Sequence, residues 1–342
     1  MLDARVHLLN SITFHFLPTL FILCISEDYC YDEPRCDVHR VFTGGFASAV
    51  PQTRTRGGDM FPPCHPLIEE HHSPINLDHR MTRNLSLGPL HLEGFDETQT
   101  GHWTLKNDGH SGEYSVDRSL AQSSAGGLPD VYHTVQVHFH WGGVATNGSE
   151  HTVDGRRYPM EMHVVNMKSI HPNVTAALGD PTGLAVLGFF IDVVYADNVH
   201  FGLVSQKLSS VAYKGQATKI KPFPLADLLP KRNMSQYYRY SGSLTTPPCA
   251  RAVVWTLYQV PIYISWTQLA QFTSQIFSTE EDAEQVTPLQ NNFRHVHPTF
   301  GRLVSASRDA GVPAGAPGRP LGPDASLRLL AMVLLGSFLC GL

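Results

Sequence analysis

Two short stretches, HFHW at residues 138–141 and MEMH at residues 160–163, decide how this chain folds and what it can do. Side chains alternate between the two faces of a β-strand, so His138 and His140 point the same way. Both stretches are flanked by β-branched and apolar residues, which is typical of paired strands. His163, on a neighbouring strand, would complete a set of three imidazoles. Such a set leaves the fourth tetrahedral position of a zinc ion open, as in a catalytic rather than a structural zinc site.

The polar residues around the histidines strengthen this interpretation. An H-x-H pair alone is weak evidence, because the chain has 19 histidines and cupin-type metal sites use the same pair with a distant third histidine. Gln136 and Glu161 each precede a candidate ligand by two residues, so they lie on the ligand face and can accept the second ring N–H of an imidazole. A buried glutamate beside three histidines also needs compensation, because burial of an unpaired carboxylate is costly.

Eight motifs follow one another along the chain: SPINLD (73–78), NDGH (107–110), QVHFHW (136–141), GSEHTVDG (148–155), MEMHVV (160–165), YRYSGSLTTPPC (238–249), VVWTLY (253–258) and NNFR (291–294). They occur in the order in which the α-class carbonic anhydrases carry them. The chain therefore resembles this family over roughly residues 66–304, and within it the vertebrate membrane-anchored extracellular group, types four and fifteen. The resemblance implies a Zn²⁺ enzyme that reversibly hydrates carbon dioxide to bicarbonate and a proton, by zinc-hydroxide attack with a histidine proton shuttle. It also implies inhibition by sulfonamides and anions.

Composition and periodicity predict a single, mainly β domain with short helices. The net charge is −5 and 16% of the residues are charged, so we expect no nucleic-acid partner. Residues 183–194 and 250–260 read as strands, and residues 266–277 carry apolar side chains at the spacing of a helix. The family resemblance adds a central, largely antiparallel, twisted sheet of about ten strands.

Both ends of the chain have the composition of processing signals. We expect a signal peptide over residues 1–26, although a misassigned start codon is the alternative. The catalytic domain would span residues 27–304. Residues 305–342 would form a linker and a GPI-attachment signal removed after about Ala314, because Leu329–Leu342 is apolar but too short to span a bilayer. The protein is therefore expected on the extracellular face of the cell membrane, anchored by a GPI lipid.

Cysteines and sequons agree with export. Four cysteines lie between the two processing signals and allow three pairings, of which the resemblance implies Cys30–Cys36 and Cys64–Cys249. Four N-x-S/T sequons are possible glycosylation sites in an exported chain, at Asn84, Asn147, Asn173 and Asn233.

The resemblance also implies roles for further residues. The Thr245 hydroxyl would accept the proton of the zinc-bound hydroxide and donate to Glu150, while Thr246 would contact bicarbonate. His110 would shuttle protons, since an imidazole titrates near neutrality. The alternatives are a proline-stiffened turn for TTPP, ordinary core for the apolar residues and a plain surface position for His110. The carbon dioxide pocket would be Val165, Val186, Leu244, Val253 and Trp255, and the NNFR segment would provide Asn292, whose backbone carbonyl supports His140, and Arg294.

One segment departs from the family pattern. Residues 40–63 contain no tryptophan, and His72 stands where the family has a glutamine before Ser73. Either the gene model diverges here or the lining of the proton path differs. Two functions remain open: an active carbonate dehydratase, or a catalytically silent extracellular binding module. The retention of the three histidines with Glu150 and Thr245 favours the enzyme, whereas partners such as transport proteins cannot be read from the sequence.

Overall fold

The computed structural model describes residues 71–79, 81–98, 102–116 and 121–311. The expected signal peptide, Cys30, Cys36, Cys64, the divergent segment 40–63 and the expected GPI site at Ala314 lie outside these residues.

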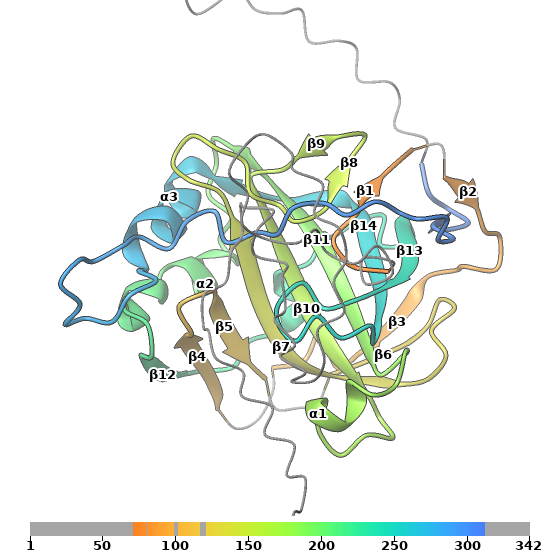
Figure 1. The fold of residues 1–342 in the computed structure, drawn as a ribbon, viewed down its shortest axis with the longest axis horizontal. Coiled ribbons are helices and arrows are strands. Elements are labelled where there is room, and N and C mark those ends of the chain that lie inside the picture. The colour runs from red at the N-terminus through yellow and green to blue at the C-terminus, as the bar shows by residue number, and fades with distance from the viewer. Residues whose placement is uncertain (1–70, 80, 99–101, 117–120, 312–342) are drawn as a thin grey trace, which may run out of the picture.

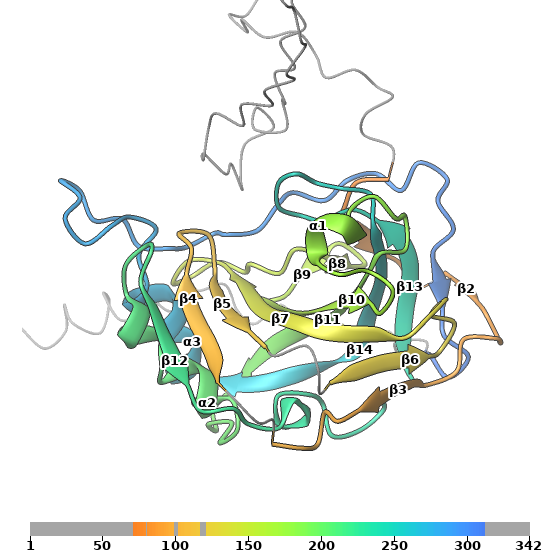
Figure 2. The same cartoon turned by 90° about the horizontal axis from the view of Figure 1, so that it is seen from below.

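A twisted sheet of 12 strands forms the centre of the described part, in the order β12-β4-β5-β7-β10-β11-β14-β13-β15-β2, with β3 and β6 attached beside β7. Its pairs are antiparallel except for β11–β14 and β15–β2. Figures 1 and 2 show β4, β5, β12 and the helices α2 and α3 at one end of the sheet, and β13 and β2 at the other. The predicted mainly β fold around a largely antiparallel sheet is confirmed. The strands of the large sheet are β2 (Thr82–Arg83), β3 (Leu90–Glu93), β4 (Trp103–Asn107), β5 (Gly112–Ser115), β6 (Gln122–Ala125), β7 (Tyr132–Trp141), β10 (Met160–Lys168), β11 (Leu184–Val194), β12 (Ala217–Ile220), β13 (Tyr237–Gly242), β14 (Val253–Ser265) and β15 (Ser305–Ala306).

The remaining elements are short. A small sheet combines β1 (Asn76–Leu77), β8 (Thr152–Val153) and β9 (Arg156–Arg157). The helices are α1 (Val174–Ala177), α2 (Gly202–Ser205), α3 (Trp266–Gln275) and the 3₁₀ turns η2 (Leu208–Val211) and η3 (Leu225–Asp227). The described residues contain no helix that is both long and apolar enough to cross a membrane.

The predicted helix and strands appear with small shifts in their ends. Helix α3 begins at Trp266 because Ser265 and Gln268 form a reciprocal capping box. Strand β14 runs past the predicted end at residue 260, and its register with β11 shifts around Pro261, which has no N–H for the ladder. Hydrogen bonding to β11 then resumes through Ser265.

Side-chain alternation separates two hydrophobic clusters on opposite faces of the central strands. Phe139, Met162 and Phe189 belong to one cluster, whereas Val165, Val186 and Trp255 belong to the other. The histidines of β7 and β10 alternate with the first group, so they share a face with the second. This register places the candidate site on the face of the second cluster.

Residues 305–311 belong to the folded unit rather than to a linker. Ser305 and Ala306 form β15 against β13 and β2. The N–H of Gly311 donates to the side chain of Gln259 at 3.0 Å. The domain therefore continues beyond the expected boundary at residue 304, because this segment supplies a strand to the sheet.

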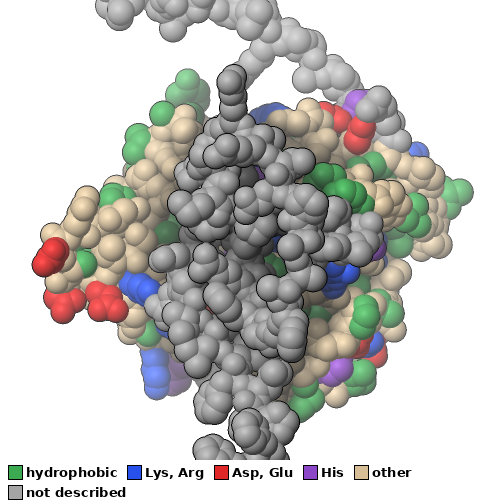
Figure 3. All heavy atoms as spheres, viewed as in Figure 1, with side chains coloured by type: hydrophobic (Ala, Val, Ile, Leu, Met, Phe, Trp, Pro, Cys, Tyr) green, Lys and Arg blue, Asp and Glu red, His purple; other side chains and the backbone are tan. Residues whose placement is uncertain are grey.

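One loop carries a concentration of negative charge. Glu280, Glu281, Asp282 and Glu284 are exposed on the segment that follows α3. Figure 3 shows acidic side chains gathered at one edge of the molecule. This edge lies beyond α3, away from the strands that carry the histidines (Figure 1).

Candidate active site

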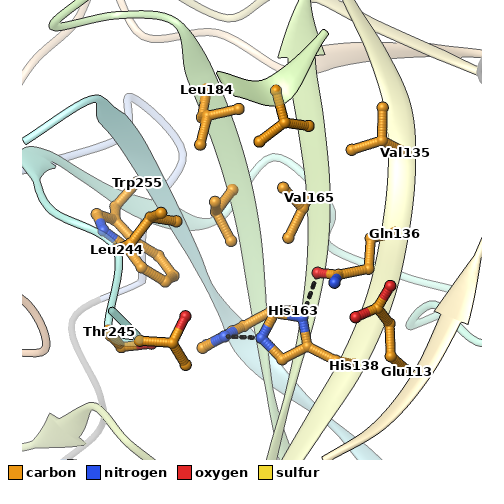
Figure 4. A pocket seen from close by; sticks show the side chains of 13 residues that line it. Glu113, Val135, Gln136, His138, His163, Val165, Leu184, Leu244, Thr245 and Trp255 are labelled. Atoms are coloured by element: carbon orange, nitrogen blue, oxygen red, sulfur yellow. Dashed lines mark hydrogen bonds between the residues drawn. The ribbon is translucent and has the colours of Figure 1, made fainter. Parts of the chain in front are cut away.

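Strands β7 and β10 bring three histidines together. His138 lies directly opposite His163, and His140 lies opposite Glu161, in the antiparallel register of these strands. Paired residues project from the same face of a sheet, so the three imidazoles converge. One ring nitrogen from each histidine lies within 4.8 Å of the other two. Figure 4 shows His138 and His163 side by side, projecting from neighbouring strands into one cavity.

The outward nitrogen of each ring is held by an acceptor. His138 Nδ1 lies 2.8 Å from Gln136 Oε1, and His140 Nδ1 lies 2.7 Å from the backbone oxygen of Asn292. His163 Nε2 lies 2.7 Å from Glu161 Oε1. Because each acceptor requires a proton on the nitrogen it faces, the tautomers are fixed. The inward nitrogens, Nε2 of His138 and His140 and Nδ1 of His163, therefore present lone pairs to one another.

The inward nitrogens fit a cation. His163 Nδ1 lies 3.2 Å from His138 Nε2, where two lone pairs repel. Burial lowers the pKa of His138 well below its usual value and also lowers the pKa of His140, so these rings stay neutral. His140 Nε2 is buried and makes no hydrogen bond within the described part of the chain. Neutral, oriented imidazoles with converging lone pairs are the donors that zinc prefers.

A buried chain of polar groups extends from His163 away from the cavity. Glu161 Oε1 lies 2.7 Å from His151 Nδ1, and His151 Nε2 lies 2.7 Å from the Tyr240 hydroxyl. That hydroxyl lies 2.9 Å from Ser73 Oγ. Burial alone would raise the pKa of the Glu161 carboxyl, but the interactions with His151 and His163, including a hydrogen bond from each, hold it well below its usual range. Glu161 therefore stays a carboxylate that can fix the orientation of His163.

The hydrogen bonds of Glu150 differ from the sequence-based expectation in the donor that its carboxylate binds. Its Oε1 accepts the backbone N–H of Arg294 at 3.0 Å, and its Oε2 lies 3.5 Å from His140 Nε2. Oε2 is buried and has no donor among the residues described. The structure therefore contains no hydrogen bond from Thr245 to Glu150, and the Arg294 backbone N–H is the donor that the carboxylate has among the described residues.

A cavity of about 250 Å³ opens beside the histidines. Its walls divide into a polar side with the histidines and Gln136, and an apolar side with Trp255 (Figure 4). Of the expected pocket residues, Val253 does not line it; its side chain is fully buried within the second hydrophobic cluster. The lining residues are Glu113, Val135, Gln136, His138, His163, Val165, Val174, Leu184, Val186, Leu244, Thr245, Thr246 and Trp255.

Asn292 connects the histidines to the segment that carries His110. Its side-chain amide donates to the backbone oxygens of His110 at 2.8 Å and Phe139 at 3.1 Å, and its Oδ1 accepts the N–H of Trp141 at 2.7 Å. The backbone N–H of His110 donates to Asp108 at 2.7 Å. The structure thus fixes the backbone of His110 near β7, although its half-buried side chain is not among those that line the cavity.

The expected modification sites lie on the surface. Asn147, Asn173 and Asn233 are exposed and Asn84 is half-buried. Cys249 follows the TTPP segment with a φ of 56°, and its expected partner Cys64 lies outside the described residues.

Three residues of the buried polar chain behind His163 were not predicted from the sequence: His151, Tyr240 and Ser73. His151 directly follows Glu150, but two adjacent residues of a strand normally face opposite ways, so alternation gave no reason to join it to Glu161. Tyr240 and Ser73 are 167 positions apart, and only the folded chain brings them together. Glu113 also lines the cavity. It was not predicted because it lies just after the NDGH motif and belongs to none of the motifs quoted above.

Comparisons with known proteins agree with this geometry. The family model of the eukaryotic-type carbonic anhydrases matches residues 57–308. The chain is 37% identical over 247 residues to carbonic anhydrase 15 of Mus musculus, a match that covers 70% of this chain and 76% of the relative. It is 36% identical over 239 residues to carbonic anhydrase 6 of Homo sapiens (69% and 75%), and 34% identical over 276 residues to carbonic anhydrase 12 of Homo sapiens (80% and 76%). From the converging imidazoles, the fold and these matches, we conclude that this chain belongs to the eukaryotic-type carbonic anhydrase family and is an enzyme that interconverts carbon dioxide and bicarbonate.

Proposed function

We propose that the protein binds one zinc ion through His138, His140 and His163 and uses it for the reversible hydration of carbon dioxide. The observation that carries this proposal is the fixed tautomer of each ring, which leaves three lone pairs pointing at a common centre. A bound zinc ion lowers the pKa of a coordinated water toward neutrality and so supplies a nucleophile at physiological pH, an effect for which carbonic anhydrase is the reference example.

The surrounding residues then have distinct tasks. Glu150 and Thr245 would orient the nucleophile, with the free Oε2 of Glu150 as the acceptor that the Thr245 hydroxyl reaches once a ligand is in place. The backbone N–H of Thr245 and the side chain of Thr246 would hold an oxygen of bicarbonate. Val165, Val186 and Leu244, with Trp255, would receive carbon dioxide, because an uncharged molecule gains from an apolar wall.

His110 would carry the proton released in each cycle to solution. An imidazole can accept and donate a proton near neutral pH. Support comes from Asn292, which binds the backbone of His110 and accepts the ring N–H of His140 through its own carbonyl. Asn292 would thereby fix the position of the His110 backbone relative to the His140 ring.

Replacement of single ligands tests the zinc proposal. His138→Ala, His140→Ala and His163→Ala should each remove zinc at physiological zinc concentration and abolish hydration, because two imidazoles do not complete the site. Metal analysis and a carbon dioxide hydration assay measure the two losses. A primary sulfonamide should bind the unaltered protein and none of the three variants. Full activity with two histidines would show that the metal, if any, lies elsewhere.

We further propose that the enzyme works outside the cell on a lipid anchor. Support comes from the composition of residues 1–26, from the small residues at Ala314 before an apolar tail, and from the four sequons. The disulfides would be Cys30–Cys36 and Cys64–Cys249. Phosphatidylinositol-specific phospholipase C should release the enzyme from intact cells. Retention after lipase treatment, with the C-terminal tail still detectable, would point to a spanning segment instead.

A further inference from the structure

Helix α1 places a glycosylation sequon beside the cavity. Asn173, the first residue of the sequon Asn173-Val174-Thr175, is the N-cap of α1, and its Oδ1 accepts the backbone N–H of Ala176 at 2.9 Å. Val174, the next residue, lines the cavity. Of the thirteen described lining residues, only Val174 is exposed, with 39% of its surface accessible. The sequon therefore stands at the solvent end of the cavity's apolar wall.

The side chain of Asn173 is oriented for attachment of a glycan. An N-linked glycan is joined to Nδ2, and the cap uses only Oδ1. Nδ2 of Asn173 makes no hydrogen bond with the described residues. The Nδ2 of Asn147 differs, because it donates to the backbone oxygen of Arg157 at 3.0 Å. Asn173 and Thr175 are both exposed, so a glycan at this position requires no change in the cap or in the packing of α1.

We propose that Asn173 carries an N-linked glycan that screens the mouth of the cavity and selects ligands by size. The proposal rests on the zinc site and the export proposed above. Carbon dioxide and bicarbonate are small enough to pass a hydrated glycan. A ligand with a bulky group attached to its zinc-binding end must lay that group across Val174, where the glycan stands. Such a ligand should associate slowly, because fewer of its approaches are productive.

Two substitutions of Thr175 separate the glycan from the protein surface. Thr175→Ala removes the sequon but leaves Asn173 and its cap, whereas Thr175→Ser keeps the sequon and serves as the matched control. Asn233→Gln removes a sequon on the loop before β13, none of whose residues lines the cavity. The full-length variants would be expressed in mammalian cells, and glycopeptide mapping would establish which asparagines are occupied. The probes are benzenesulfonamide and the same group coupled to a dextran.

We expect Asn173 to be occupied in the unaltered protein and in Thr175→Ser. Thr175→Ala should bind the dextran conjugate with a several-fold higher association rate, with unchanged association of benzenesulfonamide and unchanged kcat/KM for carbon dioxide. Removal of the glycan from the unaltered protein with an endoglycosidase should reproduce this increase, and Asn233→Gln should not.

Two results would overturn the glycan screen alone: an unmodified Asn173, or equal association rates of the conjugate before and after glycan removal. Failure of benzenesulfonamide to bind any variant would instead overturn the zinc site, and the screen with it. Glycopeptide mapping keeps the two failures distinguishable.

Discussion

His138 Nε2 and His163 Nδ1 lie 3.2 Å apart on directly opposed residues of β7 and β10, while acceptors hold the opposite nitrogen of each ring. The register of the two strands creates this closeness, and Gln136 and Glu161 determine which nitrogens meet. Two lone pairs at this separation favour a cation between them. The arrangement therefore links strand register directly to metal binding.

Glu161 should control the strength of metal binding. Glu161→Gln should weaken zinc affinity by about 10- to 100-fold, because the amide loses the charge that fixes two imidazoles at once. Competition with a chelator of known affinity measures the effect.

Tyr240→Phe is the control at the far end of the same chain of hydrogen bonds. It should leave zinc affinity close to that of the unaltered protein. It should lower the free energy of unfolding by about 1–3 kcal/mol, because His151 Nε2 loses its buried partner. If Glu161→Gln and Tyr240→Phe bound zinc with equal affinity, Glu161 would not be the residue that orients His163.

His110 and Thr245 should differ in which kinetic constant they affect. His110→Ala should lower kcat while kcat/KM for carbon dioxide stays near its original value, because kcat/KM reports the steps up to bicarbonate formation. Added imidazole buffer should restore much of the rate by carrying protons. Thr245→Ala should lower both constants without rescue, because its hydroxyl would orient the nucleophile. Equal losses in both constants for His110→Ala, without rescue by buffer, would give the NDGH segment a structural role.

Asp180 should stabilise the fold in a pH-dependent way. Hydrogen bonds from the N–H of Thr182 at 2.8 Å and from His171 and Lys168 at 3.0 Å hold the pKa of Asp180 well below its usual range. Folding therefore favours the carboxylate, and the stabilisation is fully present above the unfolded pKa of about 4. It is lost as the pH falls from there toward the lower folded pKa.

The expected result is a pH-dependent difference between two variants. Asp180→Asn should lower the free energy of unfolding by about 1–2 kcal/mol at pH 7, with a shrinking difference below about pH 4. Asp192→Asn, which breaks a single surface pair with Arg156, should cost less than about 1 kcal/mol. Denaturant unfolding across pH measures both. A pH-independent deficit in Asp180→Asn would mean that its charge is not responsible.

Local patterns in the sequence predict the elements but not their contacts. Alternation places His138, His140 and Gln136 on one strand face, and the spacing of apolar residues over 266–277 predicts α3. The sequence predicts that His163 joins the other two histidines from a neighbouring strand, but the register that sets it directly opposite His138 depends on the whole sheet and follows from no local pattern. The bond of Glu150 to the Arg294 backbone joins residues 144 positions apart, and no local pattern encodes it. The continuation of β14 past Pro261 follows from pairing with β11, which overrides the local effect of proline.

X-ray absorption spectroscopy at the zinc edge tests the central claim most directly, because it identifies the atoms bound to the metal in the purified protein. Three nitrogen ligands and one oxygen ligand at about 2.0–2.1 Å are the predicted result. In His140→Ala this signal should disappear together with the bound zinc. A shell that contains sulfur at about 2.3 Å, or a protein that hydrates carbon dioxide with no zinc bound, would contradict the account.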